Sequence, residues 1–305
     1  MIRSATVSAR LCAQGTIATR CDFFRRSPAG ARPQILGIAF TSPQVFFAKF
    51  LIFNHNREQR NAMRREQTNQ IRFIMEELLP PIIRDTALFR LAASLAWGKH
   101  ISTLAAFRKS APFGTAEEYD QLYRLHPRVH EDTDNSCACL QRIAADAVGS
   151  SFCDVGCGTG ALLTYVRREA REPIVEMVGV DMLAPDKPIG NRIKFVCSWV
   201  ENLPFADRSF DTVVCTHVIE HILDLRRAIA ELRRITRRRL IIVVPREREG
   251  IYTFNPHLNF FPYSHSFLRA MIPVPTNHVC CDIGRDIYYM EDYAQPQANI
   301  ADRAA

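Results

Sequence analysis

The chain is organised around a glycine-rich turn that lies between a strand pattern and a helical pattern. The turn reads Asp154-Val155-Gly156-Cys157-Gly158-Thr159-Gly160-Ala161, with apolar residues from Phe152 before it and Leu162, Leu163, Tyr165 and Val166 after it. Glycine tolerates positive φ and lets the backbone approach a ligand closely. The first turn of the following helix also offers N–H groups without helical partners. This order of strand, turn and helix predicts a cofactor site in an α/β fold.

The residue types in the turn bear on which ligand it holds. Gly156, Gly158 and Ala161 satisfy the G-x-G-x-x-G/A pattern of dinucleotide sites, so a nicotinamide enzyme is one alternative. Asp154 and Gly160 favour a different ligand, because a carboxylate at the strand end attracts a cationic amino group and repels a diphosphate. A cofactor with an ammonium group and no phosphate fits the turn better.

Three downstream segments extend the pattern. Residues 177–181 read as a second buried strand ending in Asp181, whose carboxylate can accept hydrogen bonds from ribose hydroxyls. Glu201-Asn202-Leu203-Pro204-Phe205 and Ser209-Phe210-Asp211 follow. Together with the turn, these residues resemble the class I S-adenosylmethionine (SAM)-dependent methyltransferases, in particular the broad small-molecule group with an E-x-L-P-F…S-F-D pattern. The resemblance covers roughly Ser150 to Pro245.

The resemblance implies SAM as cofactor and methyl transfer to a small-molecule or lipid-linked acceptor; a SAM-binding regulatory or scaffolding protein without catalysis is the alternative. Close relatives usually carry an Asp two residues before Glu201 for the adenine amine, whereas this chain has Trp199. Either Trp199 stacks near the adenine or Glu201 takes over part of its recognition. The predicted cofactor-binding residues are Asp154, Gly156, Cys157, Gly158, Gly160, Asp181, Met182, Glu201, Asn202, Thr216 and His217.

Four candidate catalytic residues follow the motifs: His217, Glu220, His221 and His257. Methyl transfer is an in-line displacement, so positioning supplies most of the catalysis, and a base is needed only if the acceptor must lose a proton. On a helical turn the first three would share one face and could converge on a divalent ion. An architectural role for this turn is the favoured interpretation, and we assign no metal ligand.

The fold class predicted is α/β, a doubly wound, mostly parallel, Rossmann-like sheet of seven strands with an N-terminal helical extension. Such sheets bind ligands at the carboxyl ends of their strands. After the strand at Phe152, strands are expected near 175–181, 193–197, 211–215 and 239–244, with a closing antiparallel hairpin. The hairpin is expected from Val279–Ile283 and Ile287–Met290.

Helix signals fall between these strands. Thr115 and Glu118 form a capping box, Asp134–Ser136 can cap the next helix, and Asp224 can cap a later one. Tyr119 or Tyr123 could close over the cofactor, although an aromatic in the core is the favoured alternative. We interpret the arginines near 226–237 as a solvated helix face. One amphipathic helix is expected over 85–108, with Leu88, Leu91, Ala92, Leu95 and Ile101 on its apolar face.

Four regions are expected. Residues 1–56 form a disordered or apolar and basic leader, which resembles a transit peptide or sequence upstream of a start codon at Met63 or Met75. Residues 57–112 form the helical extension, 113–293 the methyltransferase domain and 294–305 a tail.

Charge, apolar patterning and cysteines bear on partners and location. Residues 1–60 hold nine of the 39 basic but two of the 32 acidic residues, so they account for the whole net charge of +7, and no nucleic-acid partner is expected. The apolar run Ile35–Phe53 is interrupted by Pro43 and Lys49, which favours peripheral membrane contact over a span. Ten cysteines without a C-x-x-C pair indicate reduced thiols and a cytoplasmic location.

Overall fold

The computed structural model describes residues 79–97, 100–125, 133–185, 188–190, 192–252 and 255–293, all within the unit formed by residues 41–305. The leader, the apolar run Ile35–Phe53, the expected helix from Arg57 and the tail lie outside the described residues. Within the described ranges no helix has both the length and the apolar character that crossing a membrane requires. The eight cysteines described are free thiols.

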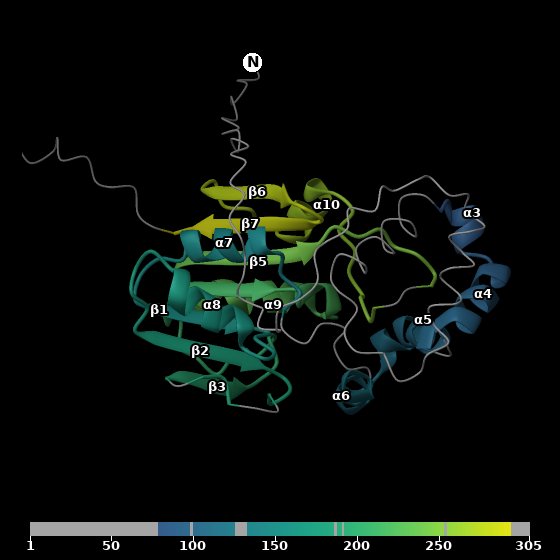
Figure 1. Cartoon of the computed structure of the whole chain (residues 1–305), viewed down its shortest axis with the longest axis horizontal. Helices are drawn as coiled ribbons and strands as arrows, with labels where there is room; N and C mark the ends of the chain where they lie inside the picture. The colour runs from purple at the N-terminus through teal and green to yellow at the C-terminus, as the bar shows by residue number, and fades with distance from the viewer. Residues whose placement is uncertain are drawn as a thin grey trace, which may run out of the picture. The chain divides into compact units, whose positions relative to one another are not determined.

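Seven strands form one sheet in the order β3-β2-β1-β4-β5-β7-β6 (Figure 1). The first five strands run parallel, and β7 and β6 are antiparallel, so the predicted fold class is confirmed. The strands are β1 Ser151–Val155, β2 Glu176–Asp181, β3 Ile193–Cys197, β4 Phe210–Thr216, β5 Thr236–Pro245, β6 His278–Ile283 and β7 Asp286–Asp292. The helices are α3 Pro81–Arg84, α4 Ala87–Trp97, α5 His100–Ser110, α6 Ala116–Leu125, α7 Cys137–Asp146, α8 Ala161–Glu169, α9 Leu225–Ile235 and α10 Ser264–Ala270.

Helices cover both faces of the sheet because alternate strand residues point to opposite sides. In β5, Ile241 and Val243 belong to the core cluster under α7 and α8, whereas Leu240, Ile242 and Val244 pack with α9 and α10. Figure 1 shows α7 and α8 on the near face and α9 behind it. The residues of the central strands β1 and β4 are buried on both sides, which explains why the sequence shows apolar runs there rather than alternation.

The predicted helix caps are confirmed. Thr115 and Glu118 exchange backbone-to-side-chain hydrogen bonds of 2.8 and 3.2 Å at the start of α6. Ser136 accepts from the backbone N–H of Cys139 at the start of α7, and Asp224 accepts from that of Arg227 at the start of α9. Each cap satisfies a donor that the first helical turn leaves without a partner.

Asp211, the last residue of the S-F-D pattern, joins the start of β4 to the start of β1. Its carboxylate accepts from the backbone N–H groups of Ser150 and Ser151 and from the Ser151 hydroxyl. Burial would raise the pKa of this carboxyl, but the hydrogen bonds and Arg237 outweigh it and hold the pKa below its usual range. The motif therefore has a structural role at the edge of the sheet opposite the glycine turn.

The expected single helix over 85–108 is wrong. The chain forms two helices there, α4 and α5. Leu88, Leu91 and Leu95 do not pack on the domain: they are 77%, 59% and 77% exposed. Among the described side chains between residues 85 and 108, Ala93 and Leu104 are buried. An apolar stripe on α4 therefore faces outward.

The extension contacts the loop that follows β5. Arg84, which is buried, donates to the backbone carbonyl of Glu249 at 2.8 Å. Arg108 donates to the carbonyl of Gly250, and its guanidinium lies 4.5 Å from the centre of the Phe260 ring. These bonds attach α3 and α5 to the loop between β5 and α10.

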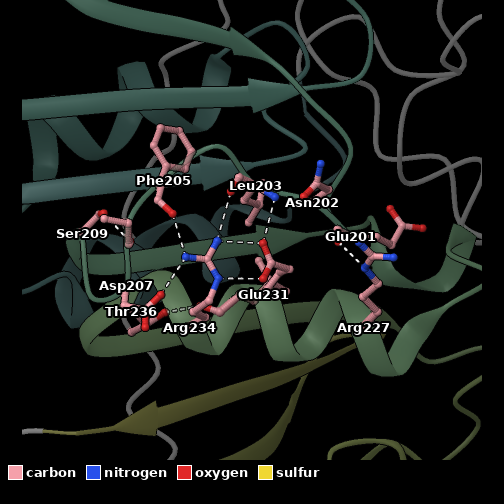
Figure 2. Close-up of polar contacts among 12 residues, drawn as sticks. Glu201, Asn202, Leu203, Phe205, Asp207, Ser209, Arg227, Glu231, Arg234 and Thr236 are labelled. Atoms are coloured by element: carbon pink, nitrogen blue, oxygen red, sulfur yellow. Dashed lines mark hydrogen bonds and ion pairs between the residues drawn. The ribbon is translucent and has the colours of Figure 1, made fainter.

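The arginines near α9 form more than the solvated face expected. Figure 2 shows Arg234 at the centre of a network with the loop between β3 and β4. Its guanidinium donates to the carbonyls of Leu203 and Phe205 and to Glu231 and Asp207. Arg227 donates to the backbone carbonyl of Glu201, whereas Arg233 and Arg237 donate to the carboxylates of Glu291 and Asp211. The E-x-L-P-F segment is thus bound to α9 by arginine.

We predict that Arg234→Met lowers the free energy of unfolding by about 1–3 kcal/mol, because two carbonyls and Glu231 lose their donor. Arg226→Met is the control, since Arg226 is an exposed residue of the same helix and it should leave stability nearly unchanged. Urea unfolding of both variants gives the comparison. Equal losses would contradict an anchoring role for Arg234.

Candidate cofactor site and adjoining histidine cluster

The glycine turn lies at the carboxyl end of β1, where the fold predicts a ligand. Gly156, Gly158 and Gly160 have φ of 82°, 52° and 75°, a region that residues with a Cβ rarely adopt. A Cβ on Gly156 would lie 2.0 Å from Val218, and one on Gly160 would lie 2.0 Å from Ile189. Both glycines are therefore required by the packing of the chain on itself, in addition to any approach of a ligand.

Three backbone N–H groups of the turn already donate hydrogen bonds within the protein. Those of Gly156 and Cys157 donate to the carbonyl of Val180 at 2.7 and 2.9 Å. That of Gly158 donates to Asp181 Oδ2 at 2.9 Å, and Asp181 Oδ1 accepts from the N–H of Leu183. A diphosphate at this turn would meet a carboxylate and occupied donors, which favours a ligand without phosphate.

The structure places the other predicted cofactor residues around the same edge of the sheet. Asp154 is buried in β1, and Thr216 ends β4, where its hydroxyl accepts from Asn135 at 2.9 Å. The Cys157 thiol packs against Gly179, where an added Cβ would lie only 2.8 Å from the sulfur. The carbonyl of Met182 accepts from the Cys197 thiol. Asn202 is exposed beyond β3.

Glu201 provides evidence that this edge receives a ligand. Its Oε2 is buried and has no hydrogen-bond partner within the described residues. Burial raises the pKa of its carboxyl. A buried acceptor without a partner costs free energy unless a ligand donor satisfies it. The site therefore fits a group that carries a donor such as an amine or a hydroxyl, as SAM does.

Helix α6 brings two tyrosines to this region. The Tyr119 ring lies 5.7 Å from that of Trp199 and stacks on Tyr123 at 4.8 Å. The Tyr119 hydroxyl donates to the carbonyl of His221. Tyr123 meets the His221 ring edge-on at 5.6 Å. Tyr119 thus bridges Trp199, beside the expected adenine position, and the turn after β4.

The turn after β4 is not the helical face that the sequence predicted. Only Ile219–His221 are helical, as a short 3₁₀ turn, and His217 precedes it with a left-handed φ of 55°. His217 Nδ1 nevertheless lies 3.7 Å from Glu220 Oε1, so those two predicted residues do meet. His221 reaches the same group from the end of the turn.

The charges in this turn follow from burial and pairing. Burial would lower the pKa of His217, but Glu220 and Asp286 outweigh it and raise the pKa. Burial would raise the pKa of Glu220, but His217 and the other histidines lower it. Burial and the neighbouring His257 lower the pKa of His221 to about 4. At neutral pH the His221 ring is therefore uncharged and carries a lone pair.

His257 joins the cluster from the loop between β5 and α10. Its ring centroid lies 4.6 Å from that of His221, and its Nδ1 lies 2.6 Å from Glu247 Oε2. The loop is attached to the turn by Asn259, whose amide donates to the carbonyls of Ile219 and Ile222. All four predicted catalytic residues therefore lie in one cluster.

Glu247 and Asn259 were not predicted as site residues. Glu247 is buried two residues after β5 ends, where an acid following a parallel strand is a usable signal. The Asn259 side chain donates to two backbone carbonyls, and a single sequence does not indicate such a contact.

We predict that Gly156→Ala lowers the free energy of unfolding by about 1–3 kcal/mol more than Gly284→Ala does. Both positions have positive φ, but a Cβ on Gly284 would meet no atom within 4 Å, so this variant measures backbone strain alone. Urea unfolding measures the difference, which reports the collision with Val218. Identical losses would refute close packing between the turn and Val218.

Comparison with known proteins agrees with the geometry. Residues 153–244 match the family model described as Methyltransferase domain. Demethylmenaquinone methyltransferase of Thermotoga maritima is 33% identical over 95 residues, which is 30% of this chain and 41% of that protein. Ubiquinone/menaquinone biosynthesis C-methyltransferase UbiE of Geobacter sulfurreducens is 30% identical over 136 residues, 40% of this chain and 50% of that protein.

Other similarities are shorter or structural. Malonyl-[acyl-carrier protein] O-methyltransferase of Pectobacterium atrosepticum is 33% identical over 89 residues, 29% of this chain and 35% of that protein. A solved SAM-dependent methyltransferase of Thermotoga maritima aligns with a TM-score of 0.42 and 17% identity, over 61% of this chain and 97% of that one. The chain spans half or less of the length of these curated relatives.

The matched segment begins in β1 and ends in β5, so it contains the glycine turn, Asp181, Glu201 and the turn after β4. SAM is the cofactor of this family. The chain carries a class I SAM-dependent methyltransferase domain.

Proposed function

We propose that the protein transfers a methyl group from SAM to a small-molecule or lipid-linked acceptor. The observation that carries the proposal is the glycine turn bound to Asp181, beside a buried Glu201 oxygen without a partner within the described residues. Two relatives support this choice of acceptor, because one is named for demethylmenaquinone and the other for malonyl-[acyl-carrier protein].

Bound SAM supplies a methyl group on a sulfonium sulfur, and the chain supplies its position. In this proposal Asp154 attracts the ammonium of the cofactor, Asp181 accepts from its ribose hydroxyls, and Glu201 or Trp199 contacts the adenine. Asp181 retains acceptor capacity for this, since each carboxylate oxygen has two lone pairs. The acceptor is expected next to His217, Glu220, His221 and His257, at the carboxyl ends of β4 and β5.

The histidine cluster provides for an acceptor that must lose a proton. His221 is uncharged at neutral pH because burial and His257 lower its pKa to about 4, so its ring can accept a hydrogen bond from the acceptor but is a weak base. Glu247 at 2.6 Å from His257 Nδ1 orients that ring and leaves its Nε2 for the acceptor side. This is the carboxylate–imidazole arrangement that holds a base in one tautomer.

A membrane-associated acceptor is the finer part of the proposal. Leu88, Leu91 and Leu95 form an outward apolar stripe on α4, at the spacing of one helix face. Ile82 on α3 is also exposed. An exposed apolar stripe of this kind fits contact with a lipid surface, from which a lipid-linked acceptor could enter.

The decisive experiment is methyl transfer from methyl-deuterated SAM to small molecules of a cell extract, followed by mass spectrometry. We expect a labelled product and S-adenosylhomocysteine with the wild-type protein. Gly158→Val should abolish both, because it fills the turn that the cofactor approaches; Gly284→Val, at another positive-φ glycine, is the control. Tight SAM binding without any labelled product would support the non-catalytic alternative.

A separate experiment addresses the lipid surface. In co-sedimentation with anionic phospholipid vesicles, Leu88→Glu combined with Leu95→Glu should reduce the bound fraction several-fold. Ile272→Glu is the matched control, because Ile272 is 68% exposed but lies beyond α10. Equal retention of both variants on the vesicles would refute a role for the α4 stripe.

A further inference from the structure

Three side chains of the histidine cluster are arranged so that one ion could contact them all. Glu220, His221 and His257 each offer one ligand atom, and these atoms lie within 4.8 Å of one another. They come from two segments far apart in the sequence, the 3₁₀ turn after β4 and the loop after β5. The convergence is therefore a product of the fold, and the set differs from the three residues considered in the sequence, because His257 replaces His217.

Two of these side chains carry a buried polar atom without a partner, although the His221 ring also has a backbone hydrogen bond with Pro256. Glu220 Oε2 and His221 Nδ1 are buried and have no hydrogen-bond partner within the described residues. His257 Nδ1 is taken by Glu247, so its Nε2 faces away from that bond. Glu220 is only 1% exposed, and a buried carboxylate oxygen without a donor is costly. A bound cation would remove that cost.

The surroundings are those that a metal site needs. A histidine ligand usually donates its other ring N–H to a carboxylate, which fixes the tautomer and orients the ring. Glu247 holds His257 in this way at 2.6 Å, and both side chains are buried. His217 Nδ1 lies 3.7 Å from Glu220 Oε1, the other oxygen of that carboxylate. The ligand His257 thus has a neighbour that orients it.

The distances require a modest adjustment. Metal–nitrogen and metal–oxygen bonds of about 2.0–2.1 Å place tetrahedral ligand atoms roughly 3.3 Å apart, so the widest pair must close by at most about 1.5 Å. His221 is the one member of the three that is not fully buried, and rotation of its side chain would supply this movement. The loop itself is held by Asn259 and by the N–H groups of Leu258 and Asn259 on the Glu220 carbonyl.

We propose that Glu220, His221 and His257 form a binding site for a divalent transition-metal ion, with Glu247 as the residue that positions His257. Two imidazoles and one carboxylate suit zinc and leave a fourth position open. An ion there would leave that position for an oxygen of the acceptor, a role that rests on the proposed function, and the two imidazoles would then be ligands rather than bases. The metal site itself does not depend on the proposed methyl transfer.

The test is metal binding by the full-length protein, prepared with chelator and then dialysed against Zn²⁺ or Co²⁺. Elemental analysis should give one metal ion per chain, and Co²⁺ should give visible bands of a four-coordinate site without a thiolate charge-transfer band. His221→Ala and His257→Ala should each weaken binding at least tenfold. Glu247→Gln should weaken it about 10–100-fold, the range typical of residues that orient a metal ligand.

His278→Ala is the matched control. His278 begins β6 and lies opposite Glu291 of β7, which in turn lies opposite Leu240 of β5. It is therefore far from the carboxyl end of β5, where the histidine cluster lies. Circular dichroism establishes whether each variant is folded. If His257→Ala does not fold, the metal affinity of His221→Ala tests the site. The proposal is overturned if the wild type binds no metal or if His221→Ala binds as tightly as His278→Ala. A thiolate band would also overturn it, because it would assign the metal to exposed cysteines such as Cys137 and Cys197.

Discussion

The bond between the glycine turn and the end of β2 is the constraint on which the candidate site depends. The carbonyl of Val180 and the carboxylate of Asp181 take N–H groups of the turn, so the turn cannot move without breaking these bonds. Val218 fills the space beside Gly156 and places the turn after β4 directly against the glycine turn. The cofactor edge and the histidine cluster are thereby built as one rigid unit.

The second constraint is the loop between β5 and α10, which is held from two sides. Asn259 attaches it to the turn after β4, and Arg84 and Arg108 attach it to the helical extension. His257 is therefore positioned by groups that are distant in sequence. The helical extension, which lies outside the matched segment, thus contacts the loop that carries His257.

The sequence predicted the sheet well because its signals are local: buried strands, a glycine turn, and caps at Thr115 and Asp224. The sequence did not predict the contacts between side chains and groups that are distant in the chain. The helical periodicity predicted a solvated face for the α9 arginines. It does not reveal that Arg234 donates to backbone carbonyls of the E-x-L-P-F loop. His217, Glu220 and His221 were expected on a helical face, yet a left-handed φ at His217 and a 3₁₀ turn bring them together differently.

We propose that the edge formed by the glycine turn, Asp181 and Glu201 binds SAM, and a crystal structure of the protein with S-adenosylhomocysteine tests this. We expect the ribose hydroxyls on Asp181 and the amino acid end near Asp154. The adenine should lie beside Trp199, with its amine or a neighbouring group on Glu201 Oε2. A ligand bound elsewhere, or an empty edge at saturating concentration, would contradict it.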